Sequence, residues 1–142
     1  MRGTAAWSVP WVVAPQLLLA LVLLATGVGK ALDVPGFAAV VARYDALPVA
    51  LLLPGVVALT MAELALSAWL VSGIRLRWAG LAAAAMHAGY AGWAGLALWR
   101  GLDIPNCGCF GVFFPRPLTA GTLAEDGALV LVSLLVAKGA RR

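Results

Sequence analysis

The stretch WVVAPQLLLALVLLATGV, from Trp11 to Val28, holds no charged residue, and Gln16 is its one strongly polar interruption. At 1.5 Å per residue, about 18 apolar residues cross the hydrocarbon core of a bilayer. The stretch therefore predicts a membrane-spanning helix over about residues 11–29. Similar apolar stretches predict three further spans, at about residues 47–71, 78–99 and 119–138.

The last of these four predicted spans has the shortest apolar part, residues 127–137. Its helix must therefore begin earlier in the sequence. Thr122 and Glu125 have the spacing of a capping box, in which the two side chains satisfy free amides at a helix start. We expect the helix to begin near Thr122.

A short amphipathic helix is predicted between the first two spans. Phe37, Val40, Val41 and Tyr44 recur at helical spacing there, which is typical of a helix that lies in the membrane interface. No internal repeat or flexible linker interrupts the chain. The predicted fold is all-α, a polytopic membrane four-helix bundle that forms one domain over residues 1–142.

The composition supports a protein surrounded by lipid. Hydrophobic residues make up 63% of the chain and charged residues only 11%, whereas a soluble domain carries about a quarter charged residues. The net charge is +4, but the basic residues are scattered between apolar blocks. A nucleic-acid site would need a basic stripe with aromatic platforms, so we expect the bilayer as a partner and no nucleic acid.

The distribution of Lys and Arg predicts the orientation in the membrane, because basic loops stay in the cytoplasm. The side of both termini carries six basic residues and the opposite side four, so both termini are expected in the cytoplasm. The first group is Arg2, Arg75, Arg77, Lys138, Arg141 and Arg142, and the second is Lys30, Arg43, Arg100 and Arg116.

The motif Cys107-Gly108-Cys109 is the sharpest chemical signal, and this orientation places it outside the cytoplasm. The two cysteines can form a disulfide only if the chain bends to bring their Cα atoms within about 7 Å. Gly108 lacks a Cβ and permits that bend. Such a small ring is expected to be easier to reduce than a relaxed structural disulfide. Reversible thiol chemistry and an inert staple remain equally open, and two thiolates are too few for a closed zinc site, so no metal is expected.

Glu63 and His87 are ionisable residues inside predicted spans, where charge is costly and often functional. Each lies about eight or nine residues from the cytoplasmic end of its helix, so their depths match. We expect them to pair. A contact that fixes helix packing is the favoured interpretation, and a proton path or a quinone contact is the alternative.

Three other charged residues are supporting candidates. Lys30 ends the first span and is expected to snorkel to the outer interface. Arg100 either marks the outer edge of its helix, which we favour, or lowers the pKa of a thiol. Asp126, next to Glu125 in the first turns of the last helix, complements the helix dipole or accepts a thiol proton.

Phe110 directly follows the second cysteine, and Phe113 and Phe114 lie close behind it. We expect these rings to anchor the loop in the membrane interface, with contact to a partner or a quinone as the alternative. No cofactor is evident from the sequence.

On these residues the chain resembles the MauE-like membrane proteins of methylamine utilisation, which are related to the broader DoxX-like four-helix group. The resemblance implies an accessory protein of the bacterial inner membrane that supports maturation of methylamine dehydrogenase, whose exported small subunit contains many disulfides. The matching residues are Gly27 to Lys30, Tyr44, Leu47, Pro48, Glu63, Arg100, Gly101 and Cys107 to Gly111.

Three functional hypotheses follow. The first is a membrane thiol–disulfide factor that exchanges with an exported cysteine-containing client or a thioredoxin-like protein. With one cysteine pair it needs a further partner or a quinone to recycle. The second is a non-enzymatic assembly or export factor with a structural staple. The third, a small-molecule carrier using Glu63 and His87, is disfavoured because no broken helix pair or inverted repeat occurs. The oligomeric state and the direction of electron flow stay open.

Overall fold

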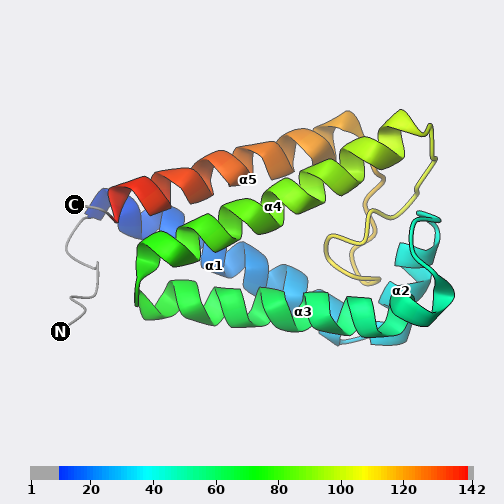
Figure 1. The fold of residues 1–142 in the computed structure, drawn as a ribbon, viewed down its shortest axis with the longest axis horizontal. Helices are drawn as coiled ribbons and strands as arrows, with labels where there is room; N and C mark the ends of the chain where they lie inside the picture. The colour runs from blue at the N-terminus through cyan, green and yellow to red at the C-terminus, as the bar shows by residue number, and fades with distance from the viewer. Residues whose placement is uncertain (1–9, 141–142) are drawn as a thin grey trace.

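The computed structural model describes residues 10–140, and every regular element in that part of the chain is a helix (Figure 1). This confirms the all-α class. A helix lies at each of the four predicted spans and at the predicted short helix between the first two, with bounds within a few residues of those expected. The helices are α1 (Pro10–Ala31), α2 (Val34–Ala42), α3 (Val49–Ser72), α4 (Leu76–Trp99) and α5 (Ala120–Gly139).

Three of these helices, α1, α3 and α5, are long and apolar enough to cross a membrane. The α4 helix has 24 residues, as many as α3, but it is rich in Ala and Gly and contains Arg77 near its start. It is not among the three helices that reach the hydropathy of a membrane span.

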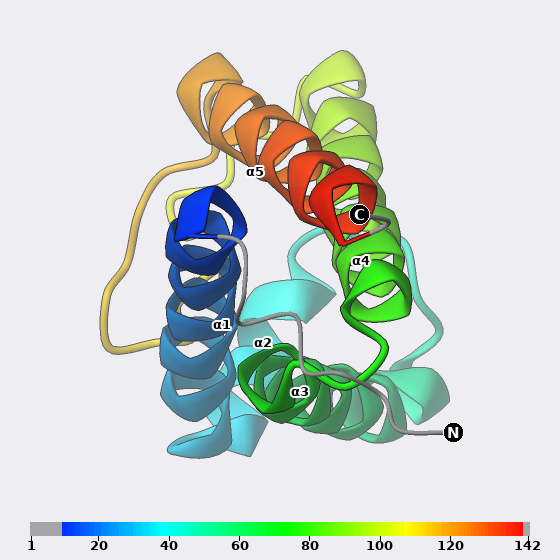
Figure 2. The same cartoon turned by 90° about the vertical axis from the view of Figure 1, so that its left-hand side faces the viewer.

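The helices pack as two pairs. Antiparallel α4 and α5 lie side by side along their length, α1 packs against α3, and α1 also contacts α5 (Figures 1 and 2). Gly80 allows the close approach of α4 and α5, because a Cβ at this position would lie 2.8 Å from the backbone nitrogen of Ala137. In an apolar environment such close backbone packing replaces the hydrophobic effect as the force between helices.

The short helix α2 begins at Asp33, whose carboxylate accepts a hydrogen bond from the backbone N–H of Gly36 at 2.9 Å. Its apolar face is buried, since Phe37 is 3% and Val40 8% exposed, and both cluster with Val56 of α3. The predicted helix is therefore present, and it covers the side of α3 near that helix's first turns.

The start of α5 differs from the expected capping box. The N-cap is Thr119, which accepts hydrogen bonds from Gly121 and Thr122, while the hydroxyl of Thr122 accepts one from the backbone N–H of Thr119. The predicted capping box, with Thr122 as the N-cap and Glu125 three residues later, is wrong. The N-cap is Thr119, and Thr122 is the residue three positions later whose side chain completes the box. Glu125 is left to bind Arg116.

One end of the bundle carries the long segment 101–119, and we call it the loop end. The short helix α2 lies at the same end, whereas the first turn of α1, the turn between α3 and α4, and the last turn of α5 lie at the opposite end (Figure 1). The cysteines are therefore held far from the described ends of the chain.

Candidate functional site

Cys107 and Cys109 form a disulfide within a tight turn of the loop end. Their Cα atoms are 5.5 Å apart, inside the range that a disulfide requires. Gly108 between them has φ +80°, in the left-handed region that favours glycine. The turn is fastened by Asn106, whose side-chain oxygen accepts a hydrogen bond from the N–H of Gly108 at 2.9 Å. Both cysteines are half-buried.

The apolar face of α2 supports this turn. A Cβ added to Gly108 would lie 3.0 Å from the ring of Phe37 and 3.1 Å from the side chain of Val40. A larger residue at position 108 would therefore meet both an unfavourable backbone conformation and a crowded surface.

The end of α1 supports the turn from another side. Gly29 and Gly111 face each other so closely that a Cβ on Gly29 would collide with the carbonyl of Phe110, and one on Gly111 with the carbonyl of Gly29. Gly29 and Gly111 both lie in the stretches that carry the family resemblance, but nothing in their spacing predicts that they meet.

Tyr44 and Arg100 connect the cysteine turn to the ends of α2 and α4. The Tyr44 hydroxyl donates to the carbonyl of Cys107 at 2.8 Å, and the Arg100 guanidinium donates to the carbonyl of Tyr44 at 2.7 Å. Burial raises the pKa of Tyr44 to about 12, so the hydroxyl stays protonated and remains a donor at neutral pH. Arg100 thus binds backbone carbonyls rather than a thiol, as its place at the end of α4 favoured.

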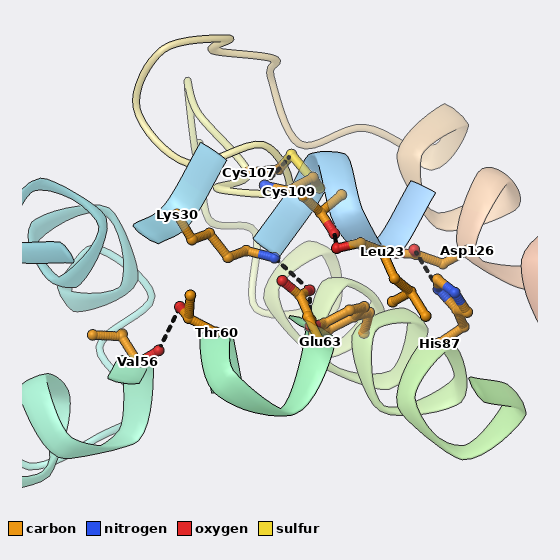
Figure 3. A network of polar contacts seen from close by, with 11 residues as sticks. Leu23, Lys30, Val56, Thr60, Glu63, His87, Cys107, Cys109 and Asp126 are labelled. Atoms are coloured by element: carbon orange, nitrogen blue, oxygen red, sulfur yellow. Dashed lines mark hydrogen bonds and ion pairs between the residues drawn. A yellow bond between two sulfur atoms is a disulfide. The ribbon is translucent and has the colours of Figure 1, made fainter. Parts of the chain in front are cut away.

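A buried polar cluster lies between the helices (Figure 3). Lys30 and Glu63 form an ion pair at 2.6 Å, with side chains 3% and 0% exposed, and the hydroxyl of Tyr90 donates to the same oxygen of Glu63. The expectation that Lys30 snorkels outward is wrong. Its ammonium turns inward because Glu63 supplies a counter-charge and the rings of Phe37 and Tyr90 lie 5.5 and 5.2 Å from it.

The expected pair of Glu63 and His87 is also wrong. Lys30 and Tyr90 occupy Glu63, while His87 faces Asp126 of α5, with 4.0 Å between Nδ1 and Oδ1 (Figure 3). Matching depths on neighbouring helices did not identify the partner, because the long side chain of Lys30 reaches Glu63 from another helix. Tyr90 lies one turn along α4 from His87, and the matching of depths did not identify this second partner of Glu63 either.

The acids at the start of α5 have different environments. Glu125 binds Arg116 at 2.7 Å in an exposed ion pair. Asp126 turns into the bundle toward His87, and its side chain is 16% exposed. Its carboxylate faces the imidazole of His87 and not a cysteine, so no contact supports the alternative in which Asp126 accepts a thiol proton.

The aromatic residues after the cysteines line an apolar pocket of about 410 Å³ on the outside of α1. Phe113 and Phe114 are each 63% exposed, and the ring of Phe110 packs edge-on against Phe114. On α1 the pocket is lined by Ala25, Val28, Gly29 and Leu32. Exposed rings of this kind are suited to a membrane interface.

A family model described as "Methylamine utilisation protein MauE" matches residues 4–139 of the chain. The matched range contains the cysteine turn and the buried polar cluster. No curated protein and no solved structure matches the chain.

Proposed function

Because the chain belongs to the MauE family of methylamine utilisation proteins, we propose that it is an inner-membrane thiol–disulfide factor that forms disulfides in an exported client. Family membership and three helices able to span a membrane already identify a membrane protein involved in methylamine utilisation. One observation carries the redox proposal: the only two cysteines of the chain are bonded to each other on a half-buried turn at the loop end.

The proposed topology has four crossings, with α4 as the fourth. The length of α4 and its position between two apolar helices support this. Both α3 and α5 run from the loop end to the opposite end, so the segment that joins them must lead back to the loop end, and α4 is long enough to do so (Figure 1). The excess of Lys and Arg on the side of the termini supports a cytoplasmic location for them. The cysteine turn then faces the exported client.

The proposed reaction is thiol–disulfide exchange. A client thiolate attacks one sulfur of the Cys107–Cys109 disulfide, that bond breaks, and a mixed disulfide forms. A second client thiolate then attacks the mixed disulfide and releases the pair as a dithiol, so two electrons pass from the client to the protein. Reoxidation takes the same two electrons to a thioredoxin-like disulfide or a lipid-dissolved quinone. The small subunit of methylamine dehydrogenase is the client that the family suggests.

One hydrogen bond supports a division of labour between the cysteines. The backbone N–H of Cys109 donates to the sulfur of Cys107 at 3.3 Å. Such a bond stabilises a thiolate on Cys107, which makes Cys107 the better leaving group. The client is therefore expected to bond to Cys109.

Cysteine-to-serine variants test the proposal in cells that make the client. The double variant Cys107→Ser, Cys109→Ser should leave client thiols unoxidised while its own abundance in the membrane is normal. Cys107→Ser alone should trap a mixed disulfide by the reverse exchange: the Cys109 thiolate attacks a disulfide of the oxidised client, that bond breaks, and no Cys107 is left to displace the client. Cys109→Ser should trap less. If the client is fully oxidised in cells that carry the double variant, the cysteine pair is a structural staple only.

A further inference from the structure

The thiol chemistry uses none of the ionisable groups buried in the bundle. Lys30, Glu63 and Tyr90 form a charge-paired unit, since the positive and negative charges are paired at 2.6 Å and Tyr90 donates to the same carboxylate oxygen. The other carboxylate oxygen of Glu63 has no hydrogen-bond partner among residues 10–140. Glu63 is fully buried. This unit is electrically neutral, and water has no access to its carboxylate.

His87 and Asp126 form a second, open unit. The two ring nitrogens of His87 have no hydrogen-bond partner among residues 10–140, although the residue is only 2% exposed. Its Nδ1 lies 4.0 Å from Oδ1 of Asp126, which is close enough for an ion pair but longer than a direct hydrogen bond. Buried polar groups nearly always have hydrogen-bond partners. A neutral imidazole beside an ionised carboxylate leaves the two ring nitrogens of His87 without one.

The charges around the unit indicate what is missing. With a neutral imidazole, Lys30, Glu63 and Asp126 sum to one negative charge inside an apolar bundle. The hydroxyls of Tyr44 and Tyr90 add no charge. At the surface, the ion pair Glu125–Arg116 is already neutral. An uncompensated charge in this environment is strongly unfavourable, and one bound proton removes it.

We propose that His87 and Asp126 form an exchangeable proton-binding site, in which the two side chains share one proton beside the charge-paired unit of Lys30, Glu63 and Tyr90. The proton has a way in, because the side chain of Asp126 is 16% exposed and lies about 10 Å along α5 from Thr119 at the loop end. The proposal goes beyond the thiol function, since it requires neither cysteine.

The single histidine of the chain makes the site directly observable. The full-length protein with ¹⁵N-labelled histidine, in lipid nanodiscs, would be titrated by NMR between about pH 5 and pH 8, where such sites exchange protons. Infrared spectroscopy on the same samples would follow the carbonyl band of a protonated carboxyl group. We expect the imidazole signal, the carboxyl band or both to titrate in the unchanged protein.

Three variants distinguish this site from other protonations. Asp126→Asn should remove the titrating carboxyl band and move any imidazole titration to lower pH, because the neighbouring negative charge is gone. His87→Gln should keep the band and shift its midpoint by about one pH unit or more. Glu125→Gln, a change of the neighbouring exposed acid, is the matched control and should titrate as the unchanged protein does.

The proposal is overturned if neither signal changes in the unchanged protein over this range. It is equally overturned if His87→Gln leaves the midpoint of the band unchanged, because the two groups would then not share the proton. His87→Gln also provides an independent answer if Asp126→Asn fails to accumulate.

Discussion

Glu63 is the residue on which three helices converge, since it belongs to α3 and binds Lys30 of α1 and Tyr90 of α4. A buried ion pair is not by itself strongly stabilising, because two charges must leave water to form it. Removing one partner, however, leaves the other charge buried and alone. The pair therefore determines which arrangement of helices is tolerated, more than how stable that arrangement is.

This view predicts strong non-additivity between Lys30 and Glu63. Lys30→Met or Glu63→Gln alone should destabilise the protein by about 3–5 kcal/mol, because each leaves an unpaired buried group. The loss of unfolding free energy in the double variant should be smaller than the sum of the losses in the two single variants. Reversible unfolding in mixed micelles measures each value, and strictly additive effects would contradict the ion pair.

Gly108 is expected to be essential for the cysteine turn, and Gly101 offers a matched control. Both have positive φ, +80° and +69°, but only Gly108 has side chains against its Cβ position, while Gly101 has open space. Gly108→Ala should therefore lower the oxidised fraction of the cysteine pair in a fixed redox buffer well below that of Gly101→Ala. Equal effects of the two changes would mean that α2 does not support the turn.

At the scale of the elements, the contact between α4 and α5 depends on small residues, because these two helices approach at backbone distance. Gly80 lies against the backbone of Ser133 and Ala137. Farther along the same helix, Gly92 has nothing within 4 Å of its Cβ position. The two glycines of α4 thus have different roles despite identical chemistry.

The corresponding prediction compares Gly80→Ala with Gly92→Ala. Overpacking at Gly80 should destabilise the protein by about 1–3 kcal/mol, since the facing backbone must move. Gly92→Ala should be neutral or stabilise by up to about 1 kcal/mol, because alanine favours helix. Unfolding of both variants in the same micelles gives the comparison, and a neutral Gly80→Ala would contradict the close helix contact.

The helices could be predicted from the sequence because the length of an apolar run sets the length of a span. The run from Trp11 to Val28 became α1, and the short helix between spans appeared where Phe37 and Val40 predicted it. The partners of Lys30 and Glu63 could not be predicted. Long polar side chains in an apolar bundle pair with whichever group they reach, and that depends on helix tilt and on which helices are neighbours.

At the scale of the whole molecule, the cysteine turn and the described chain ends lie at opposite ends of the bundle (Figure 1). The loop end holds the cysteine turn, supported by α1, α2 and the Tyr44–Arg100 contacts. The opposite end holds the start of α1, the end of α5, the turn with Arg75, and Arg77 in the first turn of α4. In the proposed topology this arrangement presents the two sulfur atoms to one side of the membrane only.

Thiol labelling in intact cells tests this arrangement most directly. After mild reductant, a membrane-impermeant reagent applied from outside the inner membrane should modify Cys107 and Cys109, and without reductant it should modify neither, because the pair is oxidised. Labelling that occurs only when the reagent is supplied from the cytoplasm, or that needs no reductant, would contradict an extracytoplasmic disulfide held at the loop end.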